Sequence, residues 1–302
     1  MPYHSIVCVK QVPDTANVTA EAMKEDGTVN RAALPTIFNP EDLHALEAAL
    51  EVKARFGGTV TAITMGPPKA GDVLRDCVFR GADRAILVTD RRAAGSDTLA
   101  TSYILAQAVK TVGKYDFVFC GRQAIDGDTA QVGPQIAEKL GVPQVTYLES
   151  LVDAQGDTVQ IRRATGHGWE IVETKLPILI TVLDSANEPR PRAAKRVMRS
   201  KGATAPIELM MPLIKEGLEG EKLQAELAKQ TEPLKERGLL LEQWGLDEIS
   251  ADPERCGLSG SPTKVHRIQA IVLTKEGYTQ VEPTEDGINA LVHELIADRT
   301  LG

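Results

Sequence analysis

Strand-like and helix-like patterns alternate between residues 5 and 140 of this chain. Short apolar runs such as Ser5–Val9 and Arg84–Val88 are typical of strands that are buried on both faces. The segments between these runs carry apolar residues at helical spacing, and the links between segments are short. The alternation predicts a mostly parallel sheet with helices on both faces, which is a Rossmann-like α/β fold.

The pattern changes after the fourth helix-like segment. Four further strand-like segments, joined by tight polar turns, cover residues 144–151, 158–164, 169–174 and 177–183. Tight turns between short strands favour an antiparallel arrangement. We therefore expect an antiparallel extension of the same sheet and assign residues 1–186 to one domain.

The last third of the chain is poor in apolar residues. A basic cluster covers residues 190–201, and a polar, charged region covers residues 206–238. A segment of this composition cannot bury a core of its own, so it either stays disordered or wraps a partner. We favour the second outcome and predict a partner-recognition segment and C-terminal arm over residues 187–302. Within it we expect a strand at 268–273 and a helix over 286–299.

Composition excludes several classes of protein. The formal net charge of −8 argues against general binding of nucleic acid. No apolar run approaches the roughly 20 residues that span a bilayer, so we expect no direct membrane span. The four cysteines are scattered, without a CxxC pair, which is typical of a reducing compartment. We therefore expect a cytoplasmic protein.

One loop, Gly121–Pro134, joins a buried strand to a helix. Its position puts free backbone N–H groups and the positive end of a helix dipole at the carboxyl edge of the sheet, where a phosphate binds. We expect the amides of Gly127–Val132 to hold it, and Asp126 and Asp128 to turn the loop and cap the helix. Arg122 is equally consistent with offsetting phosphate charge and with a surface salt bridge.

The sequence offers little machinery for side-chain catalysis. None of the five histidines lies in a recognisable frame with a Ser or Cys nucleophile, and no HxH or HExxH metal motif occurs. A nucleotide pocket without an acid, base, nucleophile or metal suits a binding module or a redox protein whose reactivity belongs to its cofactor. Ligands of such sheets lie beyond the carboxyl ends of the strands.

Several motifs together resemble the small (beta) subunit of electron transfer flavoproteins. They are the 121–134 loop, Val9–Val12, Asn39–Asp42, Met65–Pro67, Arg80–Leu87 and Lys175–Val182. The resemblance implies a Rossmann-like nucleotide- or flavin-binding domain over 1–186 and an arm that embraces a larger alpha subunit carrying FAD. In ordinary members of this family the beta subunit holds AMP.

The resemblance also implies the residues that bind the cofactor. They are Cys8, Val9, Asn39, Pro40, Glu41, Asp42, Met65, Gly121, Arg122, Gln123, Ala124, Ile125, Asp126, Gly127, Asp128, Thr129, Ala130, Gln131 and Val132. The hydroxyls of Ser96 and Thr98 are further candidates for contact with a longer cofactor. An N-cap pair for the helix over 97–112 is the alternative interpretation of these two residues.

The form of the loop at 126–134, with small residues at 127–130, resembles the electron-bifurcating branch of the family, as do residues 95–101 and 257–263. In that branch a second FAD replaces AMP. The resemblance implies that NADH donates electrons, that ferredoxin or flavodoxin is the low-potential acceptor, and that a higher-potential acceptor takes the rest. The alternatives are a non-bifurcating electron carrier that holds a structural AMP, and a stand-alone adenine-nucleotide-binding protein.

The chain departs from the family in the segment 191–196, which is basic. Many members carry there a leucine or similar anchor that docks on an acyl-CoA dehydrogenase. Its absence puts the usual dehydrogenase partner in doubt. A quinone-linked oxidoreductase or another complex recognised partly by charge is one alternative, and contact of the basic cluster with the alpha subunit is another.

Overall fold

The computed structural model describes residues 2–14, 34–264 and 280–297. The chain divides into two compact units, residues 1–265 and residues 266–302. In the second unit the described residues include one helix, α8 (Glu285–Ala297), where the sequence predicts a helix over 286–299. The strand predicted at 268–273 lies outside the described residues.

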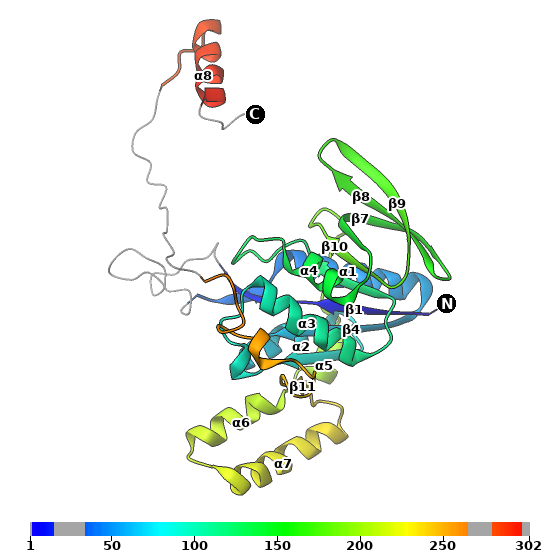
Figure 1. Cartoon of the computed structure of the whole chain (residues 1–302), viewed down its shortest axis with the longest axis vertical. Coiled ribbons are helices and arrows are strands. Elements are labelled where there is room, and N and C mark those ends of the chain that lie inside the picture. Colours follow the sequence, from blue (N-terminus) through cyan, green and yellow to red (C-terminus); the bar gives the residue numbers. More distant parts are fainter. Residues whose placement is uncertain (1, 15–33, 265–279, 298–302) are drawn as a thin grey trace. The chain divides into compact units, whose positions relative to one another are not determined.

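The first unit is built on a nine-stranded sheet, which confirms the predicted α/β fold (Figure 1). The strand order is β11-β5-β4-β1-β6-β10-β7-β8-β9, and every neighbouring pair from β11 to β7 is parallel. The strands are β1 (Tyr3–Cys8), β4 (Gly58–Met65), β5 (Arg84–Val88), β6 (Phe117–Gly121), β7 (Gln144–Gln155), β8 (Thr158–Thr165), β9 (Gly168–Lys175), β10 (Ile178–Val182) and β11 (Glu242–Trp244).

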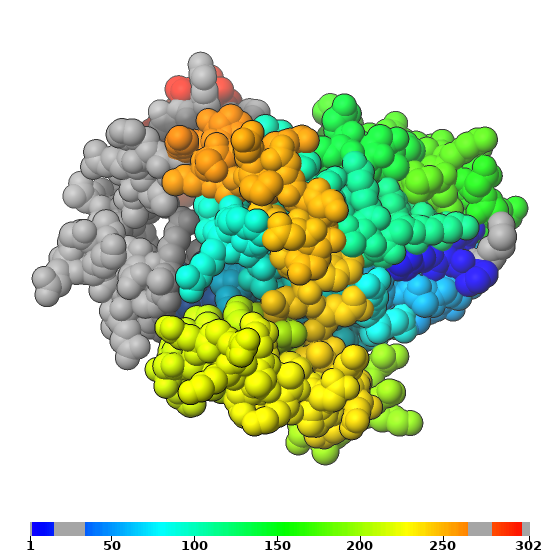
Figure 2. Space-filling view, turned by 60° about the horizontal axis from the view of Figure 1, so that its bottom comes forward, coloured from blue at the N-terminus to red at the C-terminus, as the bar shows by residue number. Residues whose placement is uncertain are grey.

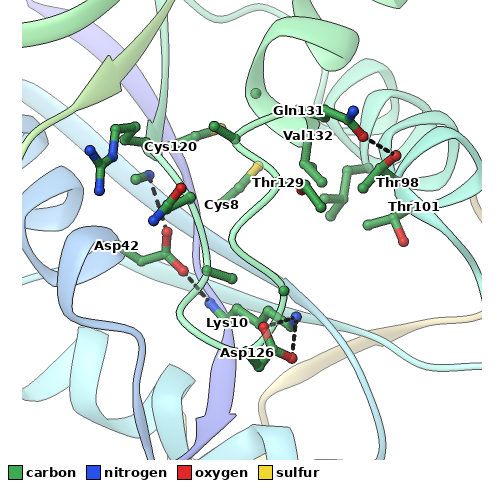
Figure 3. A pocket seen from close by; sticks show the side chains of 18 of the residues that line it. Cys8, Lys10, Asp42, Thr98, Thr101, Cys120, Asp126, Thr129, Gln131 and Val132 are labelled. Carbon is green, nitrogen blue, oxygen red and sulfur yellow. Dashed lines mark hydrogen bonds and ion pairs between the residues drawn. The ribbon is translucent and has the colours of Figure 1, made fainter. Parts of the chain in front are cut away.

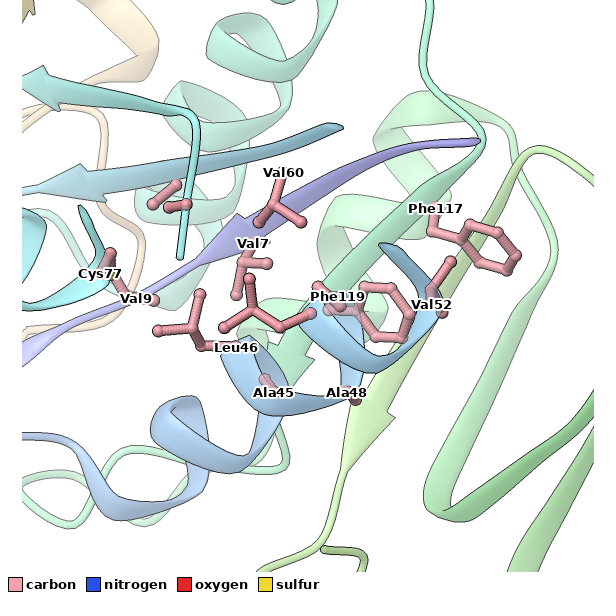
Figure 4. Close-up of a cluster of buried hydrophobic side chains, with 14 of the residues drawn as sticks. Val7, Val9, Ala45, Leu46, Ala48, Val52, Val60, Cys77, Phe117 and Phe119 are labelled. Atoms are coloured by element: carbon pink, nitrogen blue, oxygen red, sulfur yellow. The ribbon is translucent and has the colours of Figure 1, made fainter. Parts of the chain in front are cut away.

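Helices cover both faces of the sheet. They are α1 (Pro40–Phe56), α2 (Gly71–Arg80), α3 (Thr98–Val112) and α4 (Val132–Leu140). Neighbouring residues of a strand point to opposite faces. Val7 therefore packs in the core beside α1 and α2, with Leu46 and Phe119 (Figure 4), whereas Ile6 packs in the core beside α3 and α4.

One strand differs from the prediction. The sequence patterns placed residues 177–183 in an antiparallel extension, but β10 lies between β6 and β7 and is parallel to both. All five residues of β10 are buried, as in a central parallel strand, whereas β9 is largely exposed. The antiparallel extension consists of β7, β8 and β9, and β7 joins it to the parallel part of the sheet through β10.

Much of the region after residue 187 packs on the sheet. Strand β11 extends the edge beside β5, and Leu246, Ile249 and Cys256 are buried in the core beside α3 and α4. The polar, charged region forms two helices, α6 (Pro206–Lys215) and α7 (Gly220–Glu236), after the short α5 (Ala194–Ser200). The wrapping of a partner by this region remains a prediction.

A small second sheet pairs β2 (Gln11–Pro13) with β3 (Thr36–Phe38) in antiparallel fashion. It follows β1 and brings the chain to the start of α1. Among the described residues, no helix has the length and apolarity that crossing a membrane would require.

Candidate nucleotide-binding site

The candidate site lies where the strand order of the sheet reverses. From β1 the chain proceeds to β4 and β5 on one side, and it then returns to β6 on the other side. Cys8 and Cys120 are register partners at the carboxyl ends of β1 and β6. A cavity of about 360 Å³ opens beyond them (Figure 3). This is the topological switch point at which ligands of doubly wound sheets bind.

Most of the residues predicted to bind a cofactor line this cavity. They are Cys8, Val9, Asp42, Met65, Ser96, Thr98, Gly121, Arg122, Gln123, Ala124, Asp126, Gly127, Asp128, Thr129, Ala130, Gln131 and Val132. The cavity wall also includes six residues that were not among the predicted cofactor-binding residues: Lys10, Asp97, Thr101, Leu105, Cys120 and Gly133. The loops that the strand pattern placed at the carboxyl edge of the sheet therefore surround one cavity.

Four predicted residues, Asn39, Pro40, Glu41 and Ile125, are not among the lining residues. Pro40 is the first residue of α1. The Asn39 side chain donates to Gln123 O at 2.9 Å and accepts from Ile125 N at 3.1 Å. Asn39, the N-cap residue of α1, thus holds the 122–131 loop in place from outside the cavity.

Arg122 forms an ion pair in this structure. Its guanidinium lies 2.7 Å from Glu41, whose side chain is only 8% exposed. The hydrogen bond that the guanidinium donates to this carboxylate raises the pKa of Arg122 above its ordinary value. Arg122 Nε is buried, and the described residues offer it no acceptor. The guanidinium is therefore engaged by the carboxylate of Glu41.

The prediction that Asp126 and Asp128 cap the helix after the loop is wrong. The N-cap residue of α4 is Gln131, and its side chain makes no capping hydrogen bond. Asp126 accepts from Lys10 Nζ at 2.7 Å, and Asp128 accepts from the Gln123 amide at 3.0 Å. The two carboxylates tie the loop to itself and to the end of β1, which leaves the first turn of α4 uncapped.

The amides that can reach a ligand lie later in the loop than the sequence predicted. The N–H groups of Gly127 and Asp128 both donate to Ala124 O, at 3.2 and 2.9 Å. Within the described part of the chain, no acceptor is recorded for the amides of residues 129–131. The first N–H groups of α4, at Val132 and Gly133, have no partner inside the helix. The candidate donors are therefore the amides of residues 129–133.

The backbone of the loop bends these amides toward one space. Ala130 has a φ of 52°, in the left-handed region, and Gln131 after it has right-handed helical angles. Alternation of these two conformations makes successive N–H groups converge into an anion-binding nest. The nest directly precedes the N-terminus of α4, where the helix dipole is positive. Both features favour a phosphate at this place.

Asp42 connects the two strand ends that form the floor of the cavity. Its carboxylate accepts from Lys10 N at 2.8 Å and from Gly121 N at 3.1 Å (Figure 3). Burial raises the pKa of Asp42 to about 7, although these hydrogen bonds and the Lys10 charge lower it. A Cβ on Gly121 would lie 2.5 Å from Asp42 Oδ1, so this close approach requires glycine.

Ser96 and Thr98 do not form an N-cap pair. Asp97 is the N-cap of α3 and accepts from Ala100 N at 2.9 Å. Ser96 Oγ donates to Ala93 O, and Thr98 Oγ1 donates to Gln131 Oε1 at 2.8 Å. The second bond joins the start of α3 to the start of α4 across the cavity (Figure 3).

A second cavity of about 370 Å³ adjoins the first. It lies beyond the ends of β4 and β5 and shares Met65 and Ser96 with the first cavity. Residues 66–68 and 88–95 form most of its wall. The two cavities lie beside each other at the carboxyl edge of the sheet, with Met65 and Ser96 in the wall of both. In the described ranges, no group of three or more His, Cys, Asp or Glu side chains is arranged to hold a metal ion.

A doubly wound sheet with an uncapped helix at its switch point is typical of α/β proteins that bind phosphorylated ligands. Residues 26–208 match the family model described as Electron transfer flavoprotein domain. The chain therefore belongs to the electron transfer flavoprotein family, as a beta subunit, and has a role in electron transfer.

Full-length relatives agree with this assignment. Electron transfer flavoprotein subunit beta from Clostridium acetobutylicum is 41% identical over 290 residues, which cover 96% of each chain. Protein FixA from Bradyrhizobium diazoefficiens is 40% identical over 303 residues, covering 98% of this chain and 92% of FixA. The subunit beta from Megasphaera elsdenii is 42% identical over 272 residues, covering 87% and 86%.

Proposed function

We propose that this chain binds FAD at the switch point and pairs with an electron transfer flavoprotein alpha subunit in a heterodimer. The observation that carries the proposal is the uncapped start of α4, where the amides of residues 129–133 have no acceptor among the described residues and border the cavity. Residues 129–133 would hold the diphosphate of the cofactor through these amides.

The size of the accessible space favours FAD over AMP. A mononucleotide occupies the first cavity, whereas a dinucleotide continues past Met65 and Ser96 into the second. Small residues at 127–130 leave the first cavity wide, since a Cβ on Gly127 would meet no atom within 4 Å. A structural AMP in the first cavity alone is the alternative, which the first cavity's own volume supports.

The protein's own residues bind and orient the cofactor. When bound, the flavin supplies hydride and single-electron chemistry. Asp42 and Asn39 fix the loops around it, and the cores beside α1 and α3 hold the strand ends rigid. We propose NADH as donor, ferredoxin or flavodoxin as low-potential acceptor, and a dehydrogenase or quinone-linked oxidoreductase as the second acceptor. This division of electrons makes the heterodimer a bifurcating one.

The deciding experiment is the cofactor content of the purified heterodimer. The proposal predicts two FAD per heterodimer and reduction of both by NADH. A content of one FAD and one AMP per heterodimer would contradict bifurcation and would identify a plain electron carrier. A heterodimer without any nucleotide on this chain would overturn both.

A further inference from the structure

A segment near the end of the first unit lies against the wall of the cofactor cavity. Gly257 N donates to Ser96 Oγ at 2.9 Å, Ser261 Oγ accepts from Asp97 N at 2.8 Å, and Thr263 N donates to Asp97 Oδ2 at 2.9 Å. We call residues 257–263 the clamp. In Figure 2 the last part of the first unit, in orange, lies on the surface of residues drawn in cyan.

The sequence of the clamp follows from its close packing. Gly257 has a φ of 62°, and a Cβ there would lie 2.1 Å from Arg92 O. A Cβ on Gly260 would lie 2.3 Å from the carbonyl carbon of Arg255. Ser261 is 3% exposed, and its hydroxyl donates to Gly257 O at 2.6 Å. The clamp is therefore held against the 92–97 loop by its glycines and closed by the Ser261 hydroxyl.

Two hydrogen bonds link the clamp to the proposed phosphate donors. The first runs from Asp97 N to Ser261 Oγ, and the second runs from Thr98 Oγ1 to Gln131 Oε1. Asp97 makes two hydrogen bonds to the clamp: its N–H donates to Ser261 Oγ, and its Oδ2 accepts from Thr263 N. Its Oδ1 caps α3. Burial on its own would raise the pKa of Asp97, but amide hydrogen bonds, including that of Thr263, bring it below its usual value. The next residue, Thr98, donates to Gln131, which carries one of the unpaired amides before α4.

We infer that Ser261 is a positioning residue for the cofactor site. Its hydroxyl accepts from the Asp97 amide, and it thereby fixes residues 96–98 in the cavity wall and, through Thr98, the residue that precedes α4. The last residues of the first unit thus support the cavity wall through Ser96 and Asp97 without lining the cavity themselves. The inference rests on the proposed function, because it requires that the cavity take a phosphorylated cofactor.

The test compares Ser261→Ala with Ser259→Ala in the full-length heterodimer. Ser259 is exposed, and its hydroxyl donates only within the clamp region, to Cys256 O. Ser261→Ala leaves the Asp97 amide without an acceptor, so we expect affinity for FAD, and for AMP, to fall about tenfold. Ser259→Ala should bind like the unchanged protein. Ser261→Thr restores the hydroxyl and should restore affinity.

Hydrogen exchange of cofactor-free protein gives a second readout. Amides 97–101 should exchange faster in Ser261→Ala than in Ser259→Ala. If Ser261→Ala does not fold, Thr263→Pro removes both the N–H and the hydroxyl of Thr263 that bond to Asp97, and it should weaken cofactor binding in the same way. Equal affinity and equal exchange in the two serine variants would overturn the positioning role while the proposed function stands. An unchanged protein that binds neither cofactor would overturn both.

Discussion

At the scale of single residues, the site depends on backbone conformation more than on side-chain chemistry. Ala130 holds a left-handed φ that L residues other than glycine adopt at a cost of about 1–2 kcal/mol. That conformation aims the amides of residues 129–133 at the cavity. Substitution at this position therefore tests the backbone directly, without removal of a polar side chain.

We predict that Ala130→Gly retains cofactor binding and that Ala130→Val weakens it at least about tenfold. Glycine adopts a positive φ without strain, whereas a β-branched side chain opposes it. Isothermal titration of FAD and AMP into both variants provides the measurement. Equal weakening in the two variants would mean that the conformation of this residue has no part in binding.

Asp42 gives a second prediction, on the pH dependence of stability. Its pKa is 3.8 ordinarily and about 7 in the folded protein, so between these values the unfolded chain loses a proton that the folded chain keeps. Its contribution to stability is therefore largest below pH 4, falls as the pH rises to about 7, and is constant above that. The pKa of Asp90, lowered to about 2 by Arg92, acts only below pH 4.

Asp42→Asn removes the titrating group. We expect the unfolding temperature of this variant to change less between pH 5 and pH 7 than that of the unchanged protein, whatever its absolute value. Circular dichroism melts at several pH values measure the slope. The same slope in both proteins would place the pKa of Asp42 outside this window.

Single residues of the site were predictable only in part. The 121–134 loop stands out in the sequence because a strand precedes it and a helix follows it. Lys10 was not among the predicted cofactor-binding residues, because its partner Asp126 is 116 residues away in the sequence. The same ion pair explains the wrong prediction for Asp126, since local turn preferences take no account of a charge from another strand.

At the scale of elements, the approach of β6 to α1 determines the shape of the cavity floor. Gly121→Ala would place a methyl group against the Asp42 carboxylate, so we expect a loss of about 1–3 kcal/mol in stability. Gly127→Ala is the matched control, because nothing lies within 4 Å of its Cβ position. Urea denaturation separates the two. Equal stability would contradict the packing around Asp42.

Elements with a strong period were predictable from the sequence. The strand over 84–88 is a clear apolar run, and the helix that ends at Phe56 has an apolar pattern and is followed by Gly57. The three-residue strands β2, β3 and β11 are too short to show a period. Helices α6 and α7 contain Pro212 and Pro233, and a proline argues against a helix interior.

At the scale of the whole molecule, residues 239–264 complete the first unit. Leu246 is fully buried in the core beside α3, so Leu246→Ala should cost about 2–5 kcal/mol. Leu258→Ala is the control, because that side chain is 62% exposed and should change stability by less than about 0.5 kcal/mol. Chemical denaturation of the full chain measures both. A small effect at Leu246 would assign this region to a detachable arm.

The sequence underestimated how much of this region packs on the sheet. Its apolar residues are few, but they include Leu239, Leu241 and Leu246, which are buried in the two cores that flank the sheet. A composition average does not reveal that fit, because the partner surface is made by residues far away in the chain. The same limit applies to the clamp, whose glycines are explained only by the backbone they touch.

The central claim is that the amides of residues 129–133 hold the diphosphate of a cofactor. Amide hydrogen exchange of the heterodimer, with its cofactors and after their removal, tests it most directly. We predict strong protection of these amides in the loaded protein and its loss on removal. Unchanged exchange at residues 129–133, with protection elsewhere on this chain, would contradict the account.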